Sequence, residues 1–135
     1  MSGNVFDETT HYERAKYLHS AHIYHDALVE INACLRINPR EPRYQNYKGV
    51  LLYVIYGKGG NPLKYLSELV SPEDPEYSFF LRERAIIKIN AYQDNEGARD
   101  DLQHLLAINP LDDKAQRILD ELDDGITIPQ AVPAP

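Results

Sequence analysis

The chain has 135 residues and a formal net charge of −7, with 43% hydrophobic and 26% charged residues. This length suits a single domain with its own core, and the composition is that of a globular protein, favouring neither a disordered nor a fibrous class. The acid excess argues against a nucleic-acid partner, because binding to a phosphate backbone relies on clustered Lys and Arg.

The N-terminal residues and the cysteine content bear on where the protein works. Residues 1–10 are polar and lack the apolar stretch of a secretory signal, and residues 1–8 are predicted to be a flexible N-terminus. Cys34 is the single cysteine, which excludes an internal disulfide and fits a reducing compartment. The longest apolar run, residues 50–56, is far shorter than the roughly 20 residues that cross a bilayer. We therefore expect a cytoplasmic protein with no membrane partner.

Apolar residues at helical spacing predict three helices in the first half of the chain. The first covers residues 9–21. The second runs from about residue 25 to residue 37, where Asn38-Pro39 closes it, so that the two form a helical hairpin. The third begins at Pro42 and ends at the glycine-rich sequence GKGG, residues 57–60.

Four more helices are predicted in the second half. A short one has Asn61 as its N-cap and runs through Val70, after which the sequence SPEDPE interrupts the pattern. Longer ones are predicted over residues 77–92, 98–108 and about 111–125, and the last ten residues, 126–135, form a Pro-rich extended tail. The chain is therefore predicted to be all-α, with one domain over residues 9–125.

The two helices that end in Asn-Pro are related in sequence. ALVEINACLRINP, from Ala27, and ARDDLQHLLAINP, from Ala98, align without a gap at an offset of 71 residues. This offset is about two periods of a 34-residue helix-turn-helix repeat plus a few inserted residues. The pattern predicts repeated helical hairpins, with the insertion in the middle one.

The repeated pattern resembles that of the tetratricopeptide repeat family. In the second helix of the first unit, the family's aromatic, small, large, small and closing-proline positions are occupied by Tyr24, Ala27, Ile31, Cys34 and Pro39. In the first helices, the small packing residues Ala15 and Gly49 are 34 residues apart, where two helix backbones approach closely. His22 stands where the family prefers a glycine at its turn.

The resemblance covers residues 8–124 and implies stacked antiparallel helical hairpins, an α-solenoid. The units would span about residues 9–40, 41–74 and 75–110, with a capping helix at 111–125. The second unit departs from the pattern in its glycine-rich turn and its short second helix. The third has Asn95 at the aromatic position, and both Ala85 and Ile86 stay open for its small position.

The resemblance also implies a concave groove, lined by the first helix of each unit, that receives a peptide or a partner helix. In this register the groove residues are Tyr12, Lys16, His19, Arg43, Asn46, Val50, Tyr53, Arg84, Ile87 and Asn90. Aromatic and Arg side chains on a rigid concave surface are typical of binding hot spots. The Lys, Asn and Arg set with which some family members hold a C-terminal carboxylate matches only at Lys16 and Arg84, which argues against chaperone tails as ligands.

Patterns that could carry catalysis or hold a metal are weak. His19, His22 and His25 are three residues apart, but a turn is predicted between the last two, and no cysteine or clear carboxylate completes a metal site. Adjacent acids on a helix point in different directions, so the pairs at 100–101, 112–113 and 123–124 are interpreted as solvated or helix-start charges. GKGG follows a helix rather than a strand and is interpreted as a flexible turn, and Cys34 as an inert buried residue. No enzyme activity, metal or cofactor is predicted.

The leading hypothesis is a non-catalytic protein–protein interaction module that binds a peptide or partner segment in the groove. A related alternative is a small acidic chaperone for a specific client, resembling the tetratricopeptide-type chaperones of bacterial secretion systems. An alternative of another class is a metal-binding or metal-dependent protein that uses the three histidines. Self-association through the irregular middle unit or the tail, giving a homo-oligomer, is a further hypothesis.

Overall fold

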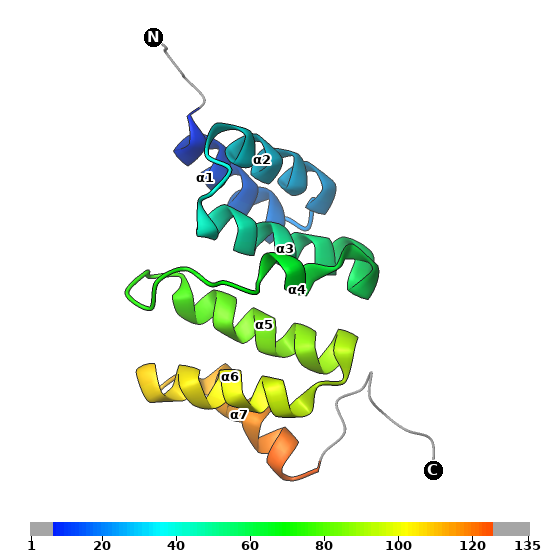
Figure 1. Cartoon of the computed structure of the whole chain (residues 1–135), viewed down its shortest axis with the longest axis vertical. Helices are drawn as coiled ribbons and strands as arrows, with labels where there is room; N and C mark the ends of the chain where they lie inside the picture. Colours follow the sequence, from blue (N-terminus) through cyan, green and yellow to red (C-terminus); the bar gives the residue numbers. More distant parts are fainter. Residues whose placement is uncertain (1–6, 126–135) are drawn as a thin grey trace. The chain divides into compact units, whose positions relative to one another are not determined.

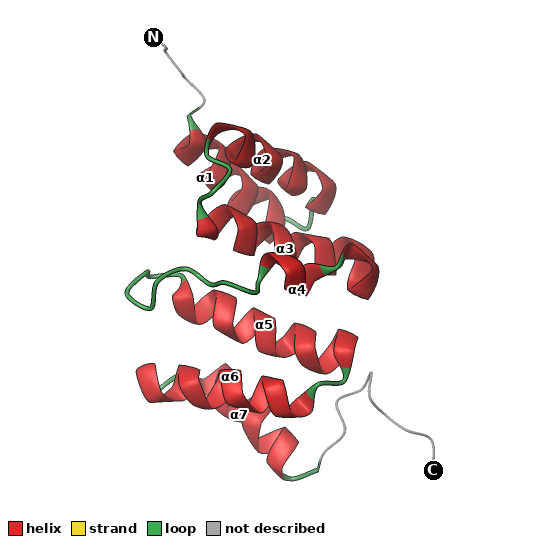
Figure 2. Cartoon of the chain, viewed as in Figure 1, coloured by secondary structure: helices red, strands yellow, loops and turns green. Residues whose placement is uncertain are grey.

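The computed structural model describes residues 7–125, which form α-helices joined by turns, with one 3-10 helix and no strand (Figure 2). The all-α prediction is confirmed over these residues. None of their helices is long and apolar enough to cross a membrane. The predicted tail, residues 126–135, and most of the predicted flexible N-terminus, residues 1–8, lie outside the described residues.

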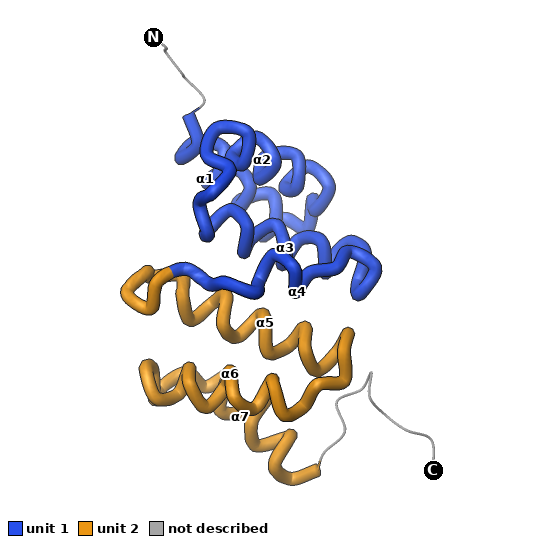
Figure 3. The backbone as a smooth tube through the Cα atoms, in the orientation of Figure 1, with its two compact units in different colours: residues 1–70 blue, residues 71–135 orange. Residues whose placement is uncertain are grey.

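The chain divides into two compact units, residues 1–70 and residues 71–135 (Figure 3). The elements of unit 1 are α1 (Glu8–Ser20), α2 (Tyr24–Ile37), α3 (Pro42–Tyr56), the 3-10 helix η1 (Gly57–Gly60) and α4 (Pro62–Tyr65). Those of unit 2 are α5 (Tyr77–Tyr92), α6 (Asn95–Ile108) and α7 (Asp113–Asp123) (Figure 1). A single domain over residues 9–125 stays a prediction.

The helix boundaries follow local sequence signals. Four helices, α1, α2, α3 and α5, begin and end within one residue of their predicted bounds. α6 begins three residues earlier than predicted, because the Asp94 side chain caps it by accepting a 2.9 Å hydrogen bond from the Gly97 amide. α7 begins at Asp113, where the Asp112 carboxylate accepts from the Ala115 amide at 3.0 Å.

The fourth helix was predicted through Val70, and this prediction is wrong: α4 is a single turn. The reason is Asn46, on α3. Its Oδ1 accepts from the Val70 amide at 3.0 Å, and its Nδ2 donates to the carbonyl oxygens of Tyr65 and Glu68 at 3.0 and 2.9 Å. Backbone groups that a longer helix would pair internally are therefore bonded to a side chain of α3. We call residues 61–70 the α4 segment.

Two positions with special backbone demands agree with the sequence pattern. His22, in the turn between α1 and α2, has φ = 64°, a left-handed conformation that favours glycine. At Gly49 of α3, an added Cβ would lie 2.9 Å from the Pro62 carbonyl oxygen and 3.0 Å from Leu66 Cγ. The predicted need for a small residue at Gly49 is confirmed, and the neighbour that imposes it is the α4 segment.

Each unit buries its own set of apolar side chains. In unit 1, α1 packs on α2, and α2 and α4 pack on α3; in unit 2, α6 packs on both α5 and α7. The aligned Asn-Pro helices bury equivalent residues without exposure, namely Ala27, Ile31 and Cys34 in α2 and Ala98, Leu102 and Leu105 in α6. Because burying a large apolar side chain contributes about 1.5–3 kcal/mol, this shared stripe explains why the two helices have related sequences.

Candidate functional site

Three buried tyrosines hold α1 against α3. The ring of Tyr12, on α1, lies 5.4 Å from that of Tyr44 and 5.6 Å from that of Tyr47, both on α3. Tilted and edge-on pairs of this kind contribute about 0.5–1.5 kcal/mol each beyond the area they bury. The rings therefore give the α1–α3 face of unit 1 a rigid base.

Polar side chains of α1 and α3 lie on these rings. The Lys16 ammonium is 4.9 Å and the Arg43 guanidinium carbon 5.9 Å from the Tyr12 ring centre, within the range of a cation–π interaction. A 2.6 Å hydrogen bond joins His19 Nδ1 to the Tyr47 hydroxyl. We call these five residues, Tyr12, Lys16, His19, Arg43 and Tyr47, the Tyr12 surface.

The Tyr12 surface has two permanent cations and a histidine that favours its neutral form. Burial lowers the pKa of His19, and the nearby His22 lowers it further. Lys16, His19 and Arg43 are each partly exposed. The surface can therefore offer cationic donors to an approaching segment, and the buried rings beneath them serve as support.

Part of the predicted groove is not available for binding. Of the ten predicted residues, Asn46, Val50 and Ile87 have at most 1% of their surface exposed and Tyr12 has 5%. Asn46 is hydrogen-bonded to the α4 segment, and the ring of Tyr12 packs against those of Tyr44 and Tyr47. Val50 and Ile87 are apolar, so their burial in the core lowers the free energy of the folded protein. We correct these four positions from groove-lining to supporting residues. Within unit 1, the structure brings Lys16, His19 and Arg43 together.

The polar groove residues predicted in unit 2, Arg84 and Asn90, differ in their surroundings. Arg84, on α5, makes a two-pronged ion pair with Asp101 of α6, at 2.8 and 2.9 Å, and the Lys88 ammonium lies 3.0 Å from the same carboxylate. Because Asp101 is only 6% exposed, the ion pair joins α5 to α6 from inside unit 2. Asn90 is partly exposed.

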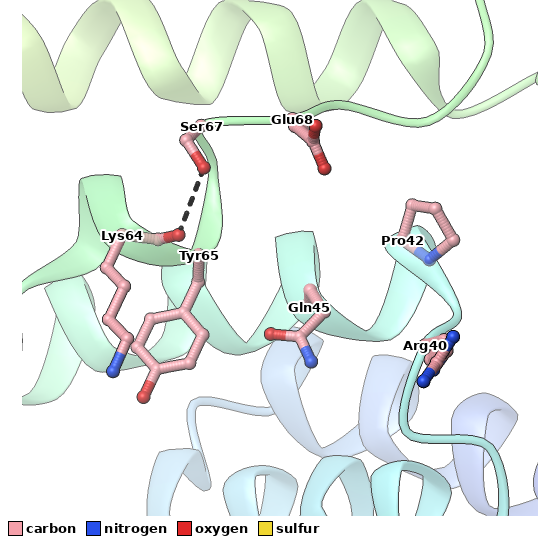
Figure 4. Close-up of a pocket in the computed structure, with 7 residues that line it drawn as sticks. All are labelled: Arg40, Pro42, Gln45, Lys64, Tyr65, Ser67 and Glu68. Carbon is pink, nitrogen blue, oxygen red and sulfur yellow. Dashed lines mark hydrogen bonds between the residues drawn. The ribbon is translucent and has the colours of Figure 1, made fainter.

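A pocket of about 180 Å³ in unit 1 was missed by the sequence analysis (Figure 4). One side is formed by residues from the start of α3 and the turn before it: Arg40, Pro42 and Gln45. The other side comes from the α4 segment: Lys64, Tyr65, Ser67 and Glu68. We call it the α4 pocket, and its lining shares no residue with the Tyr12 surface.

Hydrogen bonds fix the walls of the α4 pocket. Asn46 holds the backbone of Tyr65 and Glu68, as described above. Gln45 Nε2 donates to the Pro39 carbonyl oxygen at 3.1 Å, and the Ser67 hydroxyl donates to the Lys64 carbonyl oxygen at 3.2 Å. In Figure 4, Lys64 and Tyr65 lie side by side, with Arg40 on the opposite side and Gln45 between them.

The α4 pocket lies in the basic part of an acidic chain. Residues 31–70 contain six Lys and Arg against two Asp and Glu, whereas residues 71–135 contain six against fourteen. Lys48 and Lys64 both lie over the Tyr65 ring, at 5.3 and 5.5 Å from its centre. A charge count by segment, instead of one total of −7, is the signal in the sequence that points to this region.

Unit 2 has a pocket of about 210 Å³ between α5 and α7, lined by Arg82, Glu83, Ile86, Lys114, Arg117 and Ile118. Arg82 is already paired with the Asp112 carboxylate at 2.8 Å. Burial raises the pKa of Glu83, against the opposing effect of Arg82 and Lys114. The charge of Arg82 is therefore already engaged within unit 2.

The residues considered for catalysis or metal binding have structural surroundings. Cys34 is buried, as predicted, and burial together with the charges of nearby carboxylates raises its pKa to about 12, so that its thiol stays protonated. The rings of His19 and His22 both contact that of Tyr24, and the ring of His25 contacts that of Tyr56. Within residues 7–125, no group of three or more His, Cys, Asp or Glu could hold a metal ion.

Comparisons with known protein families, with curated proteins and with solved structures give no match.

Proposed function

We propose that the protein is a non-catalytic interaction module of stacked, tetratricopeptide-type helical hairpins, and that unit 1 binds a segment of another protein. The observation that carries this proposal is the Tyr12 surface: Lys16 and Arg43 lie over a ring that is itself packed against two further rings. A surface of this composition is suited to a partner segment with acidic and apolar side chains.

The preformed geometry favours binding over catalysis. Aromatic stacking and cation–π contacts already restrict Lys16 and Arg43, so less side-chain freedom is lost when a partner binds. The histidine of the surface is held by the Tyr47 hydroxyl and contacts the rings of Tyr24 and Tyr47. These side chains support recognition by charge on a rigid aromatic base.

Selection from a display library of random peptides, about 12 residues long, tests the proposal. We expect peptides rich in Asp or Glu with an apolar residue, and their affinity should fall about 10-fold for Lys16→Ala combined with Arg43→Ala. Arg36→Ala is the matched control, because Arg36 is exposed on α2 and lies outside the surface. Equal affinities for all three proteins, at unchanged helicity, would refute the proposal.

A further inference from the structure

The α4 pocket combines cations with hydrogen-bond acceptors on a fixed frame. Arg40 and Lys64 are exposed on opposite sides of it, and Gln45 and Glu68 supply acceptor oxygens between them (Figure 4). We infer that this pocket binds an acidic residue within an extended segment of a partner protein. The inference adds a second binding surface to the proposed function and uses none of the residues of the first.

The charge distribution selects an acidic ligand. Arg40 and Lys64 lie in the pocket and Lys48 lies beside it over Tyr65, while Glu68 is the one acidic residue of the lining. The surrounding residues 31–70 add to this positive charge, with six basic against two acidic residues. A carboxylate that enters the pocket therefore meets a positive potential in an otherwise acidic protein.

The acceptors select a peptide over a bare anion. Because Gln45 Nε2 donates to the Pro39 carbonyl oxygen, the carbonyl oxygen of the Gln45 side chain stays directed to the Lys64–Tyr65 side of the pocket (Figure 4). This oxygen and the Glu68 carboxylate can accept backbone N–H groups, but they repel a free phosphate or carboxylate. An acidic residue in an extended peptide offers both a negative side chain and backbone donors.

The size and rigidity of the pocket fit one side chain with its flanking backbone. A volume of about 180 Å³ equals that of about six water molecules at their share of about 30 Å³ each. This space suits a carboxylate side chain and is too small for a partner helix about 10 Å wide. Since Asn46 fixes the backbone of Tyr65 and Glu68, the walls need little ordering when the ligand enters.

A nuclear magnetic resonance titration of the full chain tests the inference. The probe is the capped peptide acetyl-Ala-Glu-Val-Glu-Val-Glu-Ala-amide, in which alternate side chains point to the same side when extended. We expect the amide signals of the Gln45 side chain and of residues 64–68 to shift on titration. The same peptide with Gln in place of each Glu should bind about 10-fold more weakly or not at all.

Substitutions separate charge from fold. Lys64→Gln and Arg40→Gln should each weaken binding of the peptide about 1.5- to 5-fold, the range that an exposed ion pair supplies. Glu68→Gln should strengthen it, because the repelling charge is removed while the backbone carbonyl held by Asn46 stays. Arg36→Gln is the control for net charge, and Lys16→Gln, on the Tyr12 surface, should leave this titration unchanged even if the proposed function fails.

Four results would overturn the inference. The first is equal binding of the Glu and Gln peptides. The second and third are the same shifts with inorganic phosphate alone or with a short single-stranded RNA. The fourth is a set of shifts at residues 64–68 that appears when the protein concentration is raised without peptide. The last would assign the pocket to a second copy of the chain.

Discussion

Replacing Asn46 with Ala should release the α4 segment from α3. The substitution removes three hydrogen bonds of 2.9–3.0 Å, to the Val70 amide and to the carbonyl oxygens of Tyr65 and Glu68. Each hydrogen bond contributes about 0.5–1.5 kcal/mol, and a buried group left without a partner costs about 1–3 kcal/mol. Since water can reach the part-buried carbonyls, we expect unit 1 to lose about 2–4 kcal/mol of unfolding free energy.

Asn46→Asp sharpens the test because it keeps the shape of the side chain. Its oxygen can still accept from the Val70 amide, but it has no N–H for the two carbonyl oxygens, and its charge would lie at a position with no exposure. At neutral pH we expect a loss at least as large as that for Asn46→Ala. A smaller loss would mean that the donors matter less than the acceptor.

Urea unfolding, followed by circular dichroism at 222 nm, measures the loss, and amide hydrogen exchange locates it. The Val70 amide should lose protection in both Asn46 variants. Asn32→Ala is the control, since this asparagine is partly exposed on α2 and should change stability by less than about 0.5 kcal/mol. If Asn46→Ala matches Asn32→Ala, or if Val70 stays protected, the hydrogen bonds do not hold the segment.

Three further predictions concern Asp101, Cys34 and His19. Asp101→Asn should lower the unfolding free energy of unit 2 by about 3–5 kcal/mol, because it leaves two cations of α5 without their carboxylate. Asp100→Asn, at the exposed neighbouring residue, should lower it by less than about 0.5 kcal/mol in the same urea assay. Cys34 should react with a thiol reagent at pH 8 only at the rate of unfolding, because its pKa is about 12; rapid reaction of the folded protein would contradict this. Burial lowers the pKa of His19 in the folded protein. Its contribution to stability is therefore complete above the unfolded pKa of about 6.5 and is lost as the pH falls below that value. The unsubstituted protein should lose more unfolding free energy between pH 7 and pH 5 than His19→Gln does.

The long helices could be predicted because their signals are local. Proline at the start of α3, Asn-Pro after α2 and the apolar spacing of α5 each act within a few residues, and the observed bounds agree. His22, at a position where the resembled sequence pattern prefers glycine, has the left-handed conformation that favours glycine. The end of α4 could not be predicted, because it depends on a hydrogen bond between residues 24 apart in the sequence, from Val70 to Asn46.

The candidate site was only partly predictable for a related reason. Periodicity assigns residues to a face of a helix, but it does not say whether that face meets solvent or another segment. Lys16 and Arg43 are partly exposed, as an open surface requires, whereas the same reasoning placed Asn46 and Val50 at the surface although both are buried. A polar residue such as Asn46 gives no sign in the sequence that backbone groups will satisfy it.

The irregular α4 segment is a structural partner of the buried Asn46. In a regular helix, the carbonyl oxygens of Tyr65 and Glu68 would accept bonds from their own helix, and Asn46 would be left buried without partners, at a cost of about 1–3 kcal/mol. The shortened helix and the buried asparagine therefore require each other. Gly49 adds to this dependence, since any side chain there would meet the Pro62 carbonyl oxygen. Because the same segment supplies one wall of the α4 pocket, substitutions at Asn46 should abolish peptide binding there through loss of the wall, while Lys64→Gln weakens it with the wall intact.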